Sequence, residues 1–129
     1  MENAATLAQA PQLRQLLNVD AVTCLVTGIA FTTATGMLST FLGLPAGLLF
    51  YAGLVLFPCA ALMLIAARKP AKPLVWVVIL GNFAWAIASI VVAFMFEPTT
   101  LGLAFTLAQA VLVAGLGALE WRALAQPIS

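Results

Sequence analysis

Four long apolar runs dominate the chain, and short breaks that hold glycine, proline or charge separate them. The runs cover residues 21–42, 46–67, 74–96 and 101–121. Each run has about the 20 residues that an α-helix needs to cross the hydrocarbon core of a bilayer. Because such short breaks join antiparallel neighbours, the pattern predicts an all-α polytopic membrane protein. We expect a four-helix transmembrane bundle with up-down-up-down topology.

The composition strengthens this prediction. Hydrophobic residues make up 64% of the 129 residues and charged residues only 7%, whereas a soluble domain has about 45–50% and about 25%. A chain of this size cannot hide so much apolar surface in a water-soluble core. We therefore expect the lipid bilayer to surround it. The net charge of +1 also argues against a nucleic-acid partner, because such surfaces need clustered lysine and arginine.

The basic residues predict an orientation in the membrane. With four spans, all five basic residues fall on one side, namely Arg14, Arg68, Lys69, Lys72 and Arg122. The opposite side carries only Glu97. Because positive charge is enriched in cytoplasmic segments, we expect both termini in the cytoplasm and the protein in the plasma or inner membrane.

Two segments outside the spans are predicted separately. Residues 1–20 are expected to form a cytoplasmic segment. Leu13, Leu16 and Leu17 share one helical face there, which favours a short helix lying in the membrane interface. A frayed tail is the alternative. Residues 122–129 are expected to form a short cytoplasmic tail.

Small residues recur at helical spacing in two of the predicted spans. The first span has a small-residue stripe, which consists of Gly28, Thr32, Gly36 and Thr40. The fourth span has a similar set at Ala110 and Ala114. Small residues let the backbones of membrane helices approach closely. We interpret both sets as helix-packing surfaces, within the bundle or in an oligomer, and a hydroxyl-lined pathway is the alternative for the first span.

Polar side chains are predicted near the middle of the third and fourth spans. Asn82 and Gln109 each lie about nine residues from a span end, which is mid-depth at about 1.5 Å per residue. Both need hydrogen-bond partners there, and Trp85 lies one turn from Asn82. The interpretation is an interhelical hydrogen bond, with a polar ligand site as the alternative. Further candidates for lining such a site or a pore are Thr27, Thr35 and Ser89.

Two carboxyl groups lie near predicted span ends. Asp20 opens the first span and suits an N-cap, with a titratable group in a cytoplasmic vestibule as the alternative. Glu120 is expected at the interface, paired with Arg122 or the basic loop. Carboxyl groups within a membrane mark functional sites by default, but the positions of these two at helix ends weaken that inference.

Residues that could bind a metal or carry catalysis are few, which argues against several classes of function. The chain has no histidine and two cysteines, so we expect no metal site and no cofactor. Cys24 and Cys59 have different expected depths and are interpreted as small packing residues. Without a catalytic constellation, we expect a non-enzymatic protein.

Three functions remain as hypotheses. The leading one is an accessory or scaffolding subunit, or a homo-oligomer, that contacts itself or a larger membrane protein through helix surfaces. The second is a small oligomeric channel or transporter for an ion or polar solute. The third is a binder of a lipid or quinone-like ligand, with Trp85 and Asn82 holding its head group.

Overall fold

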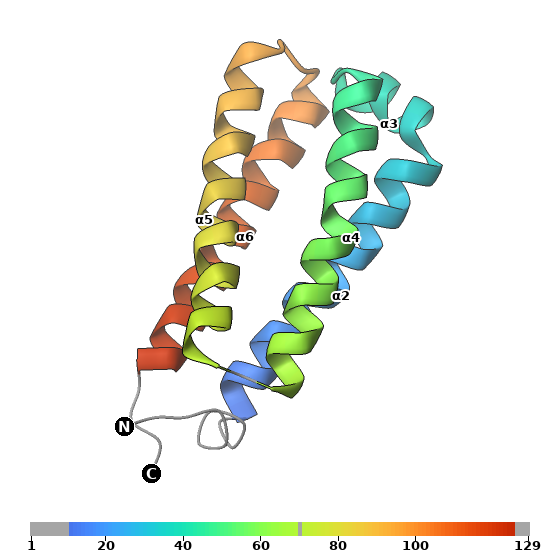
Figure 1. Cartoon of the computed structure of the whole chain (residues 1–129). Helices are drawn as coiled ribbons and strands as arrows, with labels where there is room; N and C mark the ends of the chain where they lie inside the picture. Colours follow the sequence, from blue (N-terminus) through green and yellow to red (C-terminus); the bar gives the residue numbers. More distant parts are fainter. Residues whose placement is uncertain (1–10, 70, 126–129) are drawn as a thin grey trace.

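A computed structural model describes residues 11–69 and 71–125, which are helical apart from short connections. Four of its helices are long and apolar enough to cross a membrane. The predicted all-α bundle with four candidate spans is therefore confirmed (Figure 1). In chain order the helices are α2 (Pro11–Thr33), α3 (Thr35–Leu42), α4 (Ala46–Arg68), α5 (Lys72–Met95) and α6 (Thr100–Ala125).

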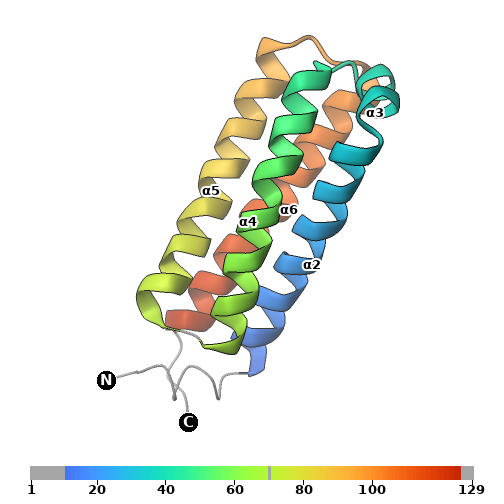
Figure 2. The same ribbon diagram turned by 45° about the vertical axis from the view of Figure 1, so that its right-hand side comes forward.

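The bundle consists of two helical hairpins. Helices α2 and α4 pack along their length, and so do α5 and α6, whereas contacts between the two hairpins are sparser. Figures 1 and 2 show that the start of α2, the α4–α5 connection and the end of α6 lie at one end of the bundle. Helix α3 and the α5–α6 connection lie at the other end. The helix-borne basic residues therefore gather at one end, and the side of the membrane that this end faces stays a prediction.

The first long helix begins earlier than the hydrophobic run predicts. Helix α2 starts at Pro11, and Leu13 and Leu17 are fully buried in a cluster with Val75 and Leu124. One face of residues 11–20 therefore packs against the bundle, and these residues form a single helix with the first half of the first span. The reason is that the leucine face of this segment meets apolar residues of α5 and α6. The predictions for residues 1–10 and 126–129 fall outside the described residues.

The first apolar run also divides into two helices. Helix α2 ends at Thr33 and α3 begins at Thr35, with Ala34 between them at φ −118° and ψ 31°. Around this point the hydroxyls of Thr32, Thr33 and Thr35 donate to the carbonyls of Gly28, Ile29 and Phe31. Hydroxyl groups that bond the preceding turn in this way often bend helices. The threonines thus give a local reason for the bend that hydropathy alone does not reveal.

Thr99 ties α3 to α6 at the end of the bundle away from the basic residues. Its N–H donates to the Leu42 carbonyl at 3.1 Å, and its hydroxyl donates to the Phe41 carbonyl at 2.7 Å. The same hydroxyl accepts the Gly102 N–H at 3.0 Å and so caps α6. A Cβ atom at Gly102 would overlap the Leu42 carbonyl oxygen. This close approach therefore requires glycine.

We expect Thr99→Ala to lower the free energy of unfolding by about 1–2 kcal/mol, because it removes a helix cap and the bond to α3. Reversible unfolding in mixed micelles measures the loss. Thr40→Ala is the matched control, since the exposed Thr40 hydroxyl bonds only Gly36 of its own helix. Equal losses in both variants would contradict a capping role for Thr99.

Candidate functional site

Three polar side chains from three different helices meet in the interior. Asn82 of α5 donates through Nδ2 to Asp20 Oδ2 of α2 at 2.7 Å and to Glu120 Oε1 of α6 at 2.8 Å. The exposed fractions of Asp20, Asn82 and Glu120 are 2%, 4% and 0%. We call these three residues the carboxyl–amide cluster. One side-chain amide thus bridges two buried carboxyl groups and links both hairpins.

The positions of both carboxyl groups correct the sequence-based interpretation. Asp20 is not an N-cap, because α2 begins at Pro11 and Asp20 lies inside the helix. Glu120 does not pair with Arg122, because Glu120 is fully buried and bonds Asn82, whereas Arg122 is exposed. The physical reason is helix rotation. Glu120 follows Leu116 by one turn, on the face that α6 turns into the bundle.

The cluster is electrostatically costly for the fold. Within the described residues, neither carboxyl group forms an ion pair with lysine or arginine, and each takes a hydrogen bond from Asn82. Glu120 Oε2 is buried without a hydrogen-bond partner. Burying polar groups that are incompletely paired costs folding free energy. A cost of this kind in a membrane-spanning segment points to function rather than to packing.

A second polar contact joins α5 to α6. Trp85 Nε1 donates to Gln109 Oε1 at 3.0 Å, and Gln109 Nε2 donates to the Thr106 carbonyl at 2.9 Å. Ser89 Oγ donates to the Trp85 carbonyl at 2.8 Å. The predicted mid-depth residues therefore find different partners. Asn82 bonds the carboxyl groups, and Gln109 bonds the indole.

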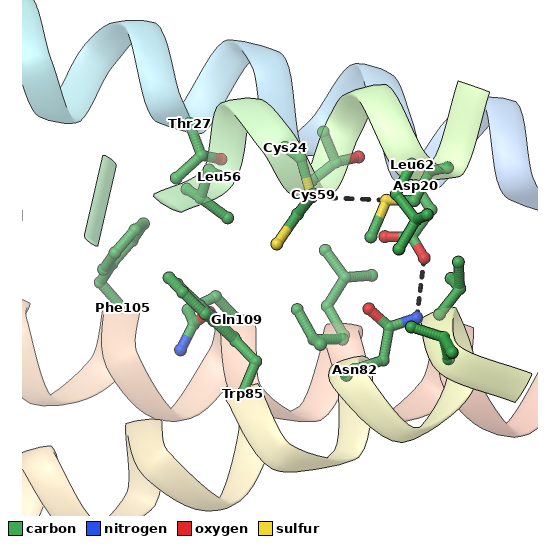
Figure 3. A pocket seen from close by; sticks show the side chains of 17 residues that line it. Asp20, Cys24, Thr27, Leu56, Cys59, Leu62, Asn82, Trp85, Phe105 and Gln109 are labelled. Carbon is green, nitrogen blue, oxygen red and sulfur yellow. Dashed lines mark hydrogen bonds between the residues drawn. The ribbon is translucent and has the colours of Figure 1, made fainter. Parts of the chain in front are cut away.

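Both polar contacts border one cavity of about 320 Å³ between the hairpins (Figure 3). Figure 3 shows Asp20 and Asn82 at one end of the cavity and Trp85, Gln109 and Phe105 toward the other. Most of the intervening wall is apolar. Val77, Phe105 and Leu112 border the cavity and are also exposed on the lateral surface of the bundle, so the wall of the cavity is thin at these side chains. The remaining labelled side chains on its wall are Cys24, Thr27, Leu56, Cys59 and Leu62.

The structure separates the predicted lining residues into three groups. Thr27, Asn82, Trp85 and Gln109 all line this cavity. Ser89 instead lines a neighbouring cavity of about 160 Å³, to which Trp85 and Gln109 also contribute. Thr35 borders neither cavity, and its hydroxyl donates to the Phe31 carbonyl.

Sequence reasoning missed that Asp20 and Glu120 join Asn82. A signal was present for Asp20, because Leu13, Leu17 and Asp20 follow one another at spacings of four and three residues. That spacing places all three on one helical face. The buried leucines therefore indicate a buried Asp20 once α2 is known to begin before them.

The small-residue stripe has two different environments. A Cβ atom at Gly28 would lie 3.1 Å from the Gly53 carbonyl oxygen of α4, and one at Gly53 would lie 3.0 Å from Thr32 Cγ2. A Cβ atom at Gly36 would meet nothing within 4 Å, and Thr40 is exposed. Gly28 and Thr32 thus face α4 inside the bundle, whereas Gly36 and Thr40 do not.

In the fourth span, Ala110 is buried and Ala114 is half-buried. The helix that packs most extensively on α6 is α5. Ala110 therefore lies in the interior of the bundle, on a helix whose main packing partner is α5.

The two cysteines are free thiols on the cavity wall. Cys24 Sγ donates to Met63 Sδ at 3.7 Å. Among the residues that the structure describes, no group of three or more histidine, cysteine or acidic side chains could hold a metal ion.

No family model, curated protein or solved structure matches the chain. The fold and the site define its class, which is a small multi-pass helical membrane protein with a cavity between two hairpins. Its function is inferred from that geometry.

Proposed function

We propose that the protein binds a small, mainly apolar molecule with a hydrogen-bonding head group in the cavity between its two hairpins. The observation that supports this function is the cavity itself, with Asp20 and Asn82 at one end of a mainly apolar wall. Small-molecule sites typically have volumes of about 300–1,000 Å³, apolar linings and a few convergent polar groups. The cavity of about 320 Å³ has these features.

A lateral opening favours a ligand that dissolves in the bilayer. Val77 on α5 and Phe105 and Leu112 on α6 border the cavity and are exposed on the outer surface, and we propose that the cavity opens beside them. In a membrane, these surfaces face lipid chains. This arrangement supports the ligand-binding hypothesis over the channel hypothesis, because a channel for polar solutes needs a polar path from one aqueous side to the other.

Filling the cavity is expected to abolish ligand binding. Gly81 lines the cavity, and a Cβ atom there would meet nothing within 4 Å. A Cβ atom at Gly115 would also be in open space, but Gly115 is not part of the cavity wall. We therefore expect Gly81→Phe to weaken binding by about tenfold or more, which corresponds to about 1.4 kcal/mol, and Gly115→Phe to leave it unchanged.

Trp85 supplies the readout for this experiment. In a Trp76→Phe and Trp121→Phe background, Trp85 is the remaining tryptophan of the three in the chain. Bromophenylbutanol is the probe, because bromine quenches indole fluorescence on contact. We expect saturable quenching in nanodiscs of zwitterionic lipid. Quenching that rises linearly, or that is equal in the Gly81→Phe and Gly115→Phe variants, would show partitioning into lipid and contradict the proposed function.

We propose helix contact with another chain as the second candidate function. The observation that favours it is the outward position of Gly36 and Thr40 on α3, next to the exposed Met37 and Phe41. These residues leave half of the small-residue stripe open to a partner, either a second copy or a larger membrane protein. The mass of the assembly extracted in mild detergent tests this candidate.

A further inference from the structure

We infer that the ligand of this cavity is an amphipathic cation, whose protonated amine binds between Asp20 Oδ1 and Asn82 Oδ1. This inference rests on the proposed ligand-binding function and adds the chemistry of the head group. It depends on which polar atoms at that end of the cavity are already bonded and which are not.

The hydrogen bonds of the carboxyl–amide cluster leave acceptors at the cavity. Asp20 uses Oδ2 and Asn82 uses Nδ2 in their mutual bond. Among the described residues, no N–H or hydroxyl group donates to Asp20 Oδ1 or Asn82 Oδ1, although both side chains are more than nine-tenths buried and line the cavity. Figure 3 shows both groups at the same end of the cavity. Two acceptors therefore face the space that a head group would occupy.

The side-chain N–H donors of Asn82, Trp85 and Gln109 on the cavity wall are already engaged. Asn82 Nδ2 bonds both Asp20 and Glu120, so both hydrogens of its amide are in use. Trp85 Nε1 bonds Gln109, and Gln109 Nε2 bonds the Thr106 carbonyl. Beside Asp20 and Asn82, a ligand carboxylate or carbonyl would thus meet two acceptors and no free side-chain N–H donor. An ammonium group, which has donors and no acceptor, complements this wall.

Charge and aromatic groups favour the same ligand. Asp20, the carboxyl group on the cavity wall, has no lysine or arginine ion-pair partner among the described residues, and hydrogen bonds between ionised partners are the stronger ones. Trp85 and Phe105 line the opposite part of the cavity. Aromatic rings accommodate both the apolar body of a ligand and a nearby cation.

The basic residues at the end of the bundle do not cancel the preference of the cavity for a cationic ligand. Asp20 lies six residues beyond Arg14 in α2, which is about 9 Å along the helix axis. Arg14, Arg68 and Lys69 are exposed. Water and salt screen exposed charges over about 8 Å at physiological ionic strength, whereas Asp20 and Asn82 border the cavity directly.

A matched set of three probes tests the inference. Bromophenylbutylamine, bromophenylbutanol and bromophenylbutanoate share one apolar body and differ in the charge of the head group. Quenching of Trp85 gives the affinity of each for the full chain in nanodiscs of zwitterionic lipid, after subtraction of empty nanodiscs. We expect the amine to bind about 10- to 100-fold more tightly than the alcohol, as a hydrogen bond to a charged group implies, and the carboxylate to bind least.

Substitutions locate the source of this preference. Asp20→Asn keeps the shape of the side chain and removes its charge, so we expect the amine to lose its advantage while the alcohol still binds. Glu97→Gln removes an exposed carboxyl group just after the C-terminal end of α5. It should leave the ratio of amine affinity to alcohol affinity unchanged. If Asp20→Asn fails to fold, the relative affinities of the three probes for the unsubstituted protein still test the inference.

The outcomes separate this inference from the proposed function. Saturable alcohol binding with no preference for the amine would overturn the cation inference and leave the ligand-binding function in place. Tighter binding of the carboxylate than of the amine would also overturn it. Absence of saturable binding for all three probes would reject both.

Discussion

Asn82→Leu is expected to lower the free energy of unfolding by about 3–5 kcal/mol, the typical cost of leaving a buried charged or polar partner unpaired. The substitution removes both hydrogen bonds of the carboxyl–amide cluster and leaves the Asp20 and Glu120 carboxyl groups buried without a donor. Losing one ordinary interhelical hydrogen bond in a membrane costs only about 0.6–2 kcal/mol. The decrease in the free energy of unfolding therefore measures the cost of burying the two carboxyl groups without a hydrogen-bond donor. Reversible unfolding in mixed micelles measures it.

Two further variants make this prediction specific. Asn18→Leu is the matched control, because Asn18 is an exposed asparagine of α2, and its effect should stay within about 0.5 kcal/mol. Combining Asn82→Leu with Asp20→Leu and Glu120→Met should recover much of the stability, because an apolar replacement of a whole buried polar set is often neutral or stabilising. If Asn82→Leu were no more destabilising than Asn18→Leu, the cluster would not be a buried network.

Gly28→Leu is expected to destabilise the bundle by about 1–3 kcal/mol or more through overpacking. A Cβ atom there would already lie 3.1 Å from the Gly53 carbonyl oxygen and 3.4 Å from Leu56 Cβ and Phe57 Cε1. The larger leucine side chain must push α2 away from α4. Thermal unfolding in detergent measures the loss, and the same sample reports the mass of the assembly.

Gly36→Leu is the matched control within the same stripe. A Cβ atom at Gly36 would meet nothing within 4 Å, so the stability of the isolated bundle should change by no more than about 0.5 kcal/mol. A change in assembly mass with unchanged stability would support a contact with another chain at α3. Similar destabilisation by both substitutions would contradict the division of the stripe between interior and outer surface.

Hydropathy predicted the main features of the fold because a bilayer imposes a simple requirement. Each span must be a helix of about 20 apolar residues, since backbone groups find no water in the hydrocarbon core. The short breaks after residues 42, 67 and 96 then leave only antiparallel neighbours. The start of α2 at Pro11 was not predicted, because the polar residues between Leu13 and Leu17 conceal a face that the neighbouring helices bury.

The candidate site was predicted in part. Asn82, Trp85, Gln109 and Thr27 were selected as polar or aromatic residues within the spans, and the structure places all four on one cavity wall. Their partners could not be derived, since hydropathy does not give the rotation of a helix about its axis. Glu120 was therefore expected to pair with Arg122 or the basic loop, whereas the rotation of α6 turns it toward Asn82.

The sequence by itself determined that this protein is a four-span helical bundle with its basic residues at one end, because span length, break length and charge position are properties of the linear chain. Only the tertiary structure decided that the chain pairs as two hairpins and leaves a cavity between them. It also decided that Asp20 and Glu120 share the amide of Asn82. These features depend on how each long helix is rotated about its axis and tilted against the other long helices. Side-chain packing between residues far apart in the sequence sets those angles.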